Sequence, residues 1–189
     1  MNVDLARYLP DDGWFRFAPR GIHGAPHTTR VLVWASVLAD RLAGTGALRR
    51  DELLWAAAVH DVGRENDGID AGHGTRSAAW VRDRLRTERP ESASLDLAVV
   101  AELCAWHEIR DLDTPHLTLE LVILKDADAL DRCRIFDLDS TRLRLAVSHR
   151  YIEPAVAIER ATNRYGTTTA ADVLVTASRV VTARMVDWR

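Results

Sequence analysis

The most constraining feature of this sequence is a set of polar residues that interrupt apolar helical stripes. In three stretches apolar residues recur at i, i+3 or i+4 and i+7, a spacing typical of helices with one buried face. In each stretch a histidine or an aspartate occupies one slot of the stripe. These residues are His27, His107 and Asp128. Burying such a group costs several kcal/mol unless it is paired or coordinated, so the fold must give each of them a partner.

The same anomaly recurs where an apolar helical run ends. His60 and Asp61 follow the run Trp55–Val59, and Gly63 comes just after them. Adjacent residues on a helix point about 100° apart, so this pair cannot satisfy itself and both side chains must turn toward a third group. His73 stands just before the next predicted helix.

One or two shared cations would satisfy these four histidines and two aspartates at once. The alternative is that each is satisfied separately, by a backbone carbonyl, a carboxylate or an arginine. Imidazole and carboxylate together suit Fe, Mn, Co, Ni or Zn better than Ca or Mg. The set contains no cysteine, which argues against a structural zinc site. We therefore predict one or two divalent transition metal ions as the cofactor.

Helical periodicity and the abundance of alanine, leucine and arginine predict an all-α fold, a single-domain helical bundle over residues 1–189. Residues 1–25 are expected to form an irregular lead-in, with Trp14, Phe15 and Phe17 packed on the core. We expect a polar loop over 64–74. The predicted helices cover 26–44, 52–60 with Asp51 as N-cap, 75–86, 94–109, 117–133, 140–151, a segment from Pro154, and a last segment after a Thr168 cap with Leu174, Val181 and Met185 in phase.

Composition excludes several classes of protein. The net charge of −3, with both signs interspersed, offers no basic surface for long nucleic acid, although a local basic pocket could still hold a phosphate. No apolar run approaches the roughly 20 residues of a membrane span, and the N-terminal residues do not form a signal peptide. Cys104 and Cys133 are far apart in apolar stretches and are expected to be buried free thiols. We therefore expect a cytoplasmic protein.

The order H…HD…H…H…D resembles that of the HD-domain superfamily of metal-dependent phosphohydrolases. The resemblance spans about residues 20–135 and implies an α-helical bundle, which we expect helices over about 136–189 to complete. The matching segments are HTTRV at 27–31, AAVHDVGR at 57–64, HGTRSA at 73–78, WH at 106–107 and KDADALDR at 125–132.

The resemblance implies a ligand set. The residues matching a one-metal site are His27, His60, Asp61 and Asp128. His73 and His107 match the extra ligands of two-metal members, in which the aspartate of the dipeptide bridges both ions. The implied activity is hydrolysis of a phosphomonoester, phosphodiester or phosphoanhydride of a small molecule such as a nucleotide. A metal-activated water would attack, with Asp61 as the catalytic residue that orients it or accepts its proton.

Two departures limit how far the substrate can be inferred. Members resembling 5′-deoxynucleotidases carry a glutamate three residues after the HD aspartate, where this chain has Arg64, and Glu65 comes one residue later. The GYP signature of cyclic-di-GMP phosphodiesterases is also absent. The substrates of those two groups are therefore not carried over.

Arg64 is the leading candidate for binding the substrate phosphate and a candidate catalytic residue. A guanidinium binds two phosphate oxygens at once, and Arg64 leads into the loop over the predicted site. The alternative is a salt bridge to Glu65, Asp67 or Asp70.

Two further residues are weaker candidates for substrate binding. His23, four residues before His27, could contact substrate at the pocket mouth, with a surface loop position as the alternative. Lys125 could contact substrate or orient Asp128, with a solvated helix charge as the alternative.

Two other functions are compatible with the same residues. Some HD-fold proteins hold two irons with the same six-ligand order and act as oxygenases, and a nucleotide-binding sensor without catalysis is a third hypothesis. The expected partner is a small phosphorylated substrate. The chain after about Phe136 carries no motif, and completing the bundle, forming a homodimer face and closing the pocket are roles open to it.

Overall fold

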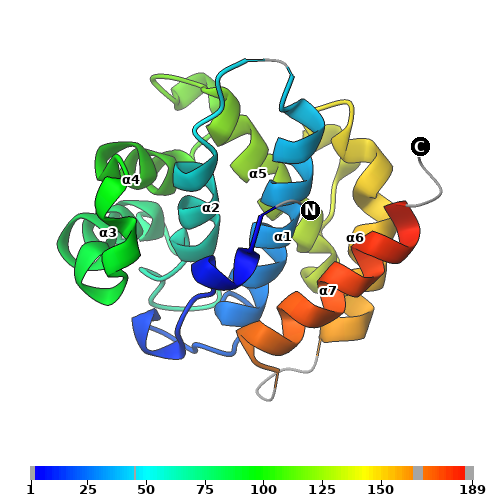
Figure 1. Cartoon of the computed structure of the whole chain (residues 1–189), viewed down its shortest axis with the longest axis horizontal. Coiled ribbons are helices and arrows are strands. Elements are labelled where there is room, and N and C mark those ends of the chain that lie inside the picture. Colours follow the sequence, from blue (N-terminus) through cyan, green and yellow to red (C-terminus); the bar gives the residue numbers. More distant parts are fainter. Residues whose placement is uncertain (1–2, 45, 164–167, 186–189) are drawn as a thin grey trace.

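The computed structural model describes residues 3–44, 46–163 and 168–185, which form helices and no strand (Figure 1). The predicted all-α bundle is therefore confirmed. The α-helices are α1 Ala25–Leu42, α2 Arg50–Val59, α3 His73–Glu88, α4 Leu97–Trp106, α5 Leu119–Asp131, α6 Ile152–Thr162 and α7 Ala170–Met185. Short 3₁₀ turns lie at Leu5–Tyr8, Asp12–Trp14, Pro90–Ser94, Asp111–Asp113, Arg132–Ile135, Ser140–Arg142 and Ser148–Tyr151.

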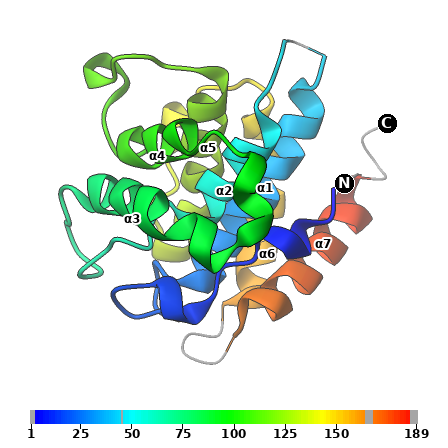
Figure 2. The same cartoon turned by 60° about the vertical axis from the view of Figure 1, so that its left-hand side comes forward.

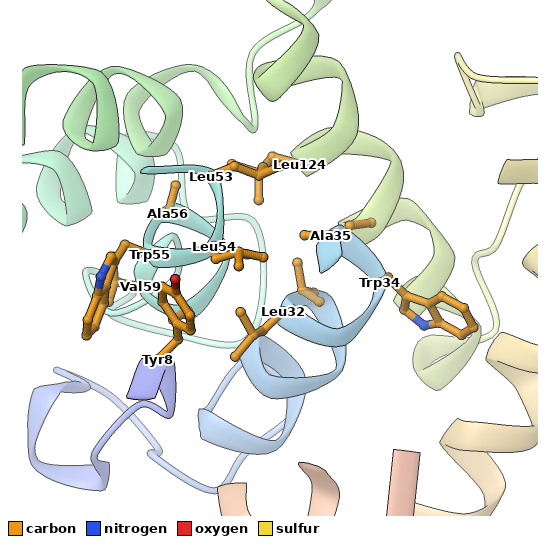
Figure 3. Close-up of a cluster of buried hydrophobic side chains, with 14 of the residues drawn as sticks. Tyr8, Leu32, Trp34, Ala35, Leu53, Leu54, Trp55, Ala56, Val59 and Leu124 are labelled. Carbon is orange, nitrogen blue, oxygen red and sulfur yellow. The ribbon is translucent and has the colours of Figure 1, made fainter. Parts of the chain in front are cut away.

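α1 forms the centre of the bundle and packs against α2, α5 and α7 (Figure 1). Every residue from 27 to 39 is buried, because this helix is apolar on most of its surface. Leu32 lies close to Leu54 of α2, while Trp34 points to the other side of α1 (Figure 3), where its ring lies 5.6 Å from that of Tyr151. As a result, the polar residues near the start of α1 are buried together with the apolar ones: His27, Thr28, Thr29 and Arg30.

α3 and α4 pack side by side next to this core (Figure 2). Two glycines allow the close approach. A Cβ on Gly74 would lie 2.6 Å from the carbonyl oxygen of Cys104, and a Cβ on Gly63 would lie 2.5 Å from the backbone nitrogen of Ser77. Larger residues at these positions would push apart the start of α3, the end of α4 and the turn after α2. The two glycines thus bring three chain segments together at one end of the bundle.

The helix predicted over 140–151 is wrong. This segment contains two 3₁₀ turns, and between them the backbone N–H groups of Arg144 and Leu145 each donate to the buried carboxylate of Asp126, at 2.9 Å. A continuous helix would use those N–H groups internally. The Asp126 carboxylate on α5 therefore keeps residues 140–151 from forming one continuous helix.

Smaller expectations also need correction. Asp51 does not cap α2, which begins at Arg50; its carboxylate instead accepts from the Tyr8 hydroxyl at 2.7 Å. Trp14 and Phe15 are buried as expected, but Phe17 is exposed. Thr169, one residue after the predicted cap, pairs reciprocally with Asp172 at the start of α7.

Other predicted boundaries differ by a few residues. α3 begins two residues earlier than expected, at His73, and α5 begins at Leu119, which leaves Leu117 exposed. The side chain of Met185 lies outside the described residues. None of the helices in the described part of the chain has the length and apolar character needed to cross a membrane.

Asp126→Ala should lower the free energy of unfolding by about 2–4 kcal/mol, because two backbone N–H groups lose a charged acceptor. Urea denaturation measures the change. The control is Asp113→Ala, which removes an exposed carboxylate that pairs with the exposed side chain of Arg110 at 2.7 Å. Exposed pairs contribute about 0–1 kcal/mol. Equal effects of the two substitutions would contradict the role given to Asp126.

Candidate metal centre

Three of the predicted ligands are oriented by the ends of helices. His60 directly follows α2, His107 directly follows α4, and His73 is the first residue of α3. In each, Nδ1 donates to the carbonyl oxygen three residues earlier, a type of group that helix ends and turns leave available. The acceptors are Ala57 at 2.9 Å, Cys104 at 2.7 Å and Asp70 at 2.8 Å. Each ring is thereby left with its Nε2 lone pair free.

His27, in the first turn of α1, also donates the proton on its Nδ1, but to a side chain and not to a main-chain carbonyl. Its Nδ1 donates to Oδ2 of Asp131, the last residue of α5, at 2.7 Å. All four histidines therefore use Nδ1 as a donor and direct Nε2 elsewhere.

The four Nε2 atoms converge in two pairs. Those of His27 and His60 are 3.3 Å apart, and those of His73 and His107 are 3.0 Å apart. With the protons on Nδ1, facing Nε2 atoms present lone pairs to each other and cannot share a hydrogen bond. This arrangement is unfavourable unless one ring of a pair takes up a second proton or a cation lies between the rings.

Asp61 lies between the two pairs of histidines. Its Oδ2 is 3.5 Å from His27 Nε2, whereas its Oδ1 is 3.1 Å from His73 Nε2 and 3.6 Å from His107 Nε2. Asp128 adds a second carboxylate, with Oδ1 3.4 Å from His27 Nε2. The structure thus brings together all six residues predicted as ligands, from five different segments of the chain.

These separations suit a metal. Donor atoms at about 2.0–2.2 Å from one ion in tetrahedral or right-angled geometry lie about 2.8–3.6 Å from each other. The closest contacts between Nε2 and carboxylate oxygens fall in this interval, from 3.1 to 3.6 Å. Groups such as His27, His60 and Asp128 can hold a metal ion. A divalent transition metal prefers this mixture of nitrogen and oxygen donors.

The electrostatics of the cluster favour a neutral imidazole at His60 and ionised carboxylates at Asp61 and Asp128. Complete burial lowers the pKa of His60 to about 3. Burial raises the pKa of Asp61, but the adjacent His60 and hydrogen bonds from other histidines outweigh it and hold that pKa well below its usual value. Burial lowers the pKa of His73, but bonds to Asp61 and Glu108 outweigh it and raise the pKa to about 10. A cation binding at His73 must therefore displace a proton.

A pocket of about 210 Å³ opens beside this cluster, and its lining is rich in positive charge. Asp61, His73, His107 and Asp128 form part of its wall. The cationic side chains that line it are Arg64, Lys125, Arg132, Arg134, Arg142 and Arg144. Such a pocket can attract and hold a small anion next to the histidine cluster.

Arg64 is the least satisfied of these cations. Its Nε and Nη1 are buried and have no hydrogen-bond acceptor among the described residues, and Nε lies 3.5 Å from Asp61 Oδ2. Two of the three alternative partners are engaged elsewhere, since Glu65 pairs with Arg16 at 2.7 Å and Asp70 pairs with Arg76. A buried guanidinium with free N–H groups in a pocket is suited to bind an anion.

The two weaker candidates for substrate binding, His23 and Lys125, both line the pocket but differ in their hydrogen bonds. His23 lines the pocket, with Nδ1 3.1 Å from Asp61 Oδ2. Lys125 also lines it, but its ammonium group donates to the Ile109 carbonyl and to Asp111 at 2.9 Å, and none of these bonds orients Asp128. The structure therefore gives Lys125 a part in the pocket wall.

Several residues around the site were not predicted. Asp131 binds His27, and Glu108 lies 3.0 Å from His73 Nδ1. Asp131 had a signal in the sequence, because it follows Asp128 by three residues and so shares its helix face. Arg142 and Arg144 had none, since they reach the pocket only because the segment after α5 folds back over it.

Comparison with known proteins agrees with this geometry. A sequence model of the HD domain matches residues 24–133, more than half of the chain. The chain belongs to the HD domain family. No curated protein and no solved structure gave a match. The HD domain segment contains all six clustered residues, and it ends before Arg134, Arg142 and Arg144. Membership places the protein in a superfamily of metal-dependent phosphohydrolases.

Adding Mn²⁺ to the metal-free protein should raise its melting temperature. At a concentration about 100-fold above Kd, the expected rise is about 5–10 °C, because the ion binds the folded state only. Differential scanning calorimetry measures it. Asp61→Asn should remove most of this rise, whereas Asp113→Asn, at an exposed carboxylate that pairs with Arg110, should keep it. An identical rise in both variants would contradict a metal centre at Asp61.

Proposed function

We propose that this protein is a metal-dependent phosphohydrolase that acts on a small phosphorylated compound such as a nucleotide. The observation that carries the proposal is the position of Arg64. Its buried Nε and Nη1, which have no hydrogen-bond acceptor in the described part of the chain, lie in the same pocket as the histidine and aspartate cluster. A site that holds a cation and a free guanidinium side by side is suited to a phosphate group, which binds to both.

We further propose that the site holds two ions. The two oxygens of Asp61 face different histidine pairs, which supports a bridging carboxylate between two positions. A divalent cation bound there would lower the pKa of a coordinated water from about 16 toward 7 and polarise a phosphoryl oxygen.

The residues of the chain have separate roles in the proposed reaction, in which a water oxygen bonds to phosphorus and the bond to the leaving group breaks. The low pKa of Asp61 makes it a weak base, so we assign it to orient the water rather than to accept its proton. Arg64 holds two phosphate oxygens. His23, at the pocket wall, is assigned to contact substrate.

The positive lining of the pocket supports an anionic substrate. Arg144 is held toward the pocket by Asp111 at 2.8 Å, and Asp111 also binds Lys125. Arg144 also pairs with Asp126 at 3.5 Å, but six cationic side chains line the pocket against the three carboxylates of Asp61, Glu108 and Asp128. We infer that this wall binds the part of the substrate beyond the reacting phosphate.

A hydrolysis screen tests the proposal. Metal-free protein is reloaded with Mn²⁺, Co²⁺, Ni²⁺, Fe²⁺ or Mg²⁺ and assayed without oxygen against nucleotides, sugar phosphates and phosphodiesters. We expect phosphate release that persists without oxygen and is abolished in Asp61→Asn, with the helical circular dichroism retained. Turnover that requires oxygen would indicate an oxygenase with the same ligands. Bound metal without turnover would indicate a nucleotide sensor.

Arg64→Ala should lower kcat/KM by about 10- to 150-fold, the loss expected for charge-assisted hydrogen bonds worth about 1.5–3 kcal/mol. Arg64→Lys should restore part of it, because lysine keeps the charge but not the two-pronged geometry. The control is Arg16→Ala, an exposed arginine paired with Glu65, which should stay within about 2-fold of the parent. Unchanged kinetics in Arg64→Ala would contradict its role as the phosphate clamp.

A further inference from the structure

We propose that Asp131, held in place by Arg30, is a positioning residue for the metal ligand His27. The pair fixes the His27 ring so that Nε2 faces the cation, and it makes that ring a stronger donor than a main-chain carbonyl would. The inference rests on the metal-binding part of the proposed function.

The contacts of Asp131 leave its carboxylate no freedom to turn. Oδ2 accepts from His27 Nδ1 at 2.7 Å and from Arg30 Nη2 at 3.1 Å, while Oδ1 accepts from Arg30 Nε at 2.6 Å. Asp131 and Arg30 are 1% and 2% exposed. Two parallel bonds from a guanidinium fix both the position and the plane of a carboxylate. The plane of the carboxylate then sets the direction of the His27 ring.

His27 needs this help because of its position in the helix. The other three histidines donate to a main-chain carbonyl three residues earlier. For His27 that carbonyl belongs to Gly24, and it already accepts the N–H of Thr28 at 3.1 Å. At the start of a helix the carbonyl groups point into the helix, so a side chain there must find its acceptor elsewhere. α5 supplies it.

The chemical consequence follows from the type of acceptor. A carboxylate that accepts from the Nδ1–H of a metal-bound imidazole orients the ring and increases its basicity. Burying a lone carboxylate would be costly, and Arg30 provides the compensating charge. Arg30 Nη1 also lies 3.5 Å from Thr162 Oγ1 of α6, outside the HD domain segment. The ligand is thereby connected to the C-terminal helices.

A purely structural ion pair is the competing explanation, because Arg30 and Asp131 also join α1 to α5. A structural pair would affect the free energy of unfolding but not the affinity for metal. The double variant Arg30→Gln with Asp131→Asn separates the two, since it removes both charges of the pair together and nearly preserves volume. Arg134, whose Nη1 lies 3.6 Å from Asp131 Oδ2, keeps its bonds to the carbonyl oxygens of Ile22 and Asp131. The matched control is Asp40→Asn with Arg50→Gln, which removes a 2.8 Å pair between α1 and α2.

Metal-free proteins are titrated with Co²⁺ in competition with a chelator, and binding is followed by the visible absorption of the ion. We expect the Arg30 and Asp131 double variant to bind one equivalent of Co²⁺ about 10- to 100-fold more weakly than the parent. The Asp40 and Arg50 double variant should bind as the parent does. Parental affinity in the first double variant would overturn the positioning role.

A measurement on the unaltered protein keeps the inference testable if the double variant fails to fold. In Zn²⁺-loaded protein labelled with ¹⁵N, we expect His27 to carry its proton at Nδ1, with slow exchange because Asp131 holds it. A proton at Nε2, or rapid exchange at Nδ1, would overturn the proposal. The titration decides the positioning role even if no hydrolysis is found, and a parent that binds no Co²⁺ would refute both proposals.

Discussion

The structure depends on the mutual approach of four buried imidazole lone pairs around one carboxylate. His27 and His60 face each other across one side of Asp61, and His73 and His107 do so across the other. Neutral rings cannot hydrogen-bond to each other when both present lone pairs, so each pair needs a bound cation or a second proton on one ring, and the raised pKa of His73 favours such a proton there. The need to bring these groups together accounts for the close packing that glycines allow between α3, α4 and the turn after α2.

The orientation of the ligands is distributed between local and distant contacts. Three rings obtain a main-chain acceptor from the preceding turn of chain, and His73 adds the carboxylate of Glu108, 3.0 Å from its Nδ1. His27 obtains its acceptor from α5, more than a hundred residues away. The lining of the pocket is also drawn from two parts of the chain. Most of the lining residues belong to the HD domain segment, whereas Arg142 and Arg144 come from the segment that follows it.

The parts of the fold that periodicity predicts well are those in which burial and helix formation agree. α1 and α5 lie within a few residues of their expected bounds, because each has a continuous apolar stripe. The helix expected over 140–151 fails because the Asp126 carboxylate competes for the backbone N–H groups of Arg144 and Leu145. No local pattern reveals this competition, since the acceptor lies on another element.

The sequence by itself determined which residues come together at the site. A histidine or aspartate in an apolar stripe is too costly to bury alone, and this cost can be inferred from the sequence without a structure. Only the tertiary structure decided how they are arranged. It set Asp61 between two histidine pairs, left two buried nitrogens of Arg64 without a hydrogen-bond acceptor among the described residues, and joined Asp131 to His27. The physical reason is that burial cost belongs to a residue type, whereas distance and direction depend on how separate helices pack.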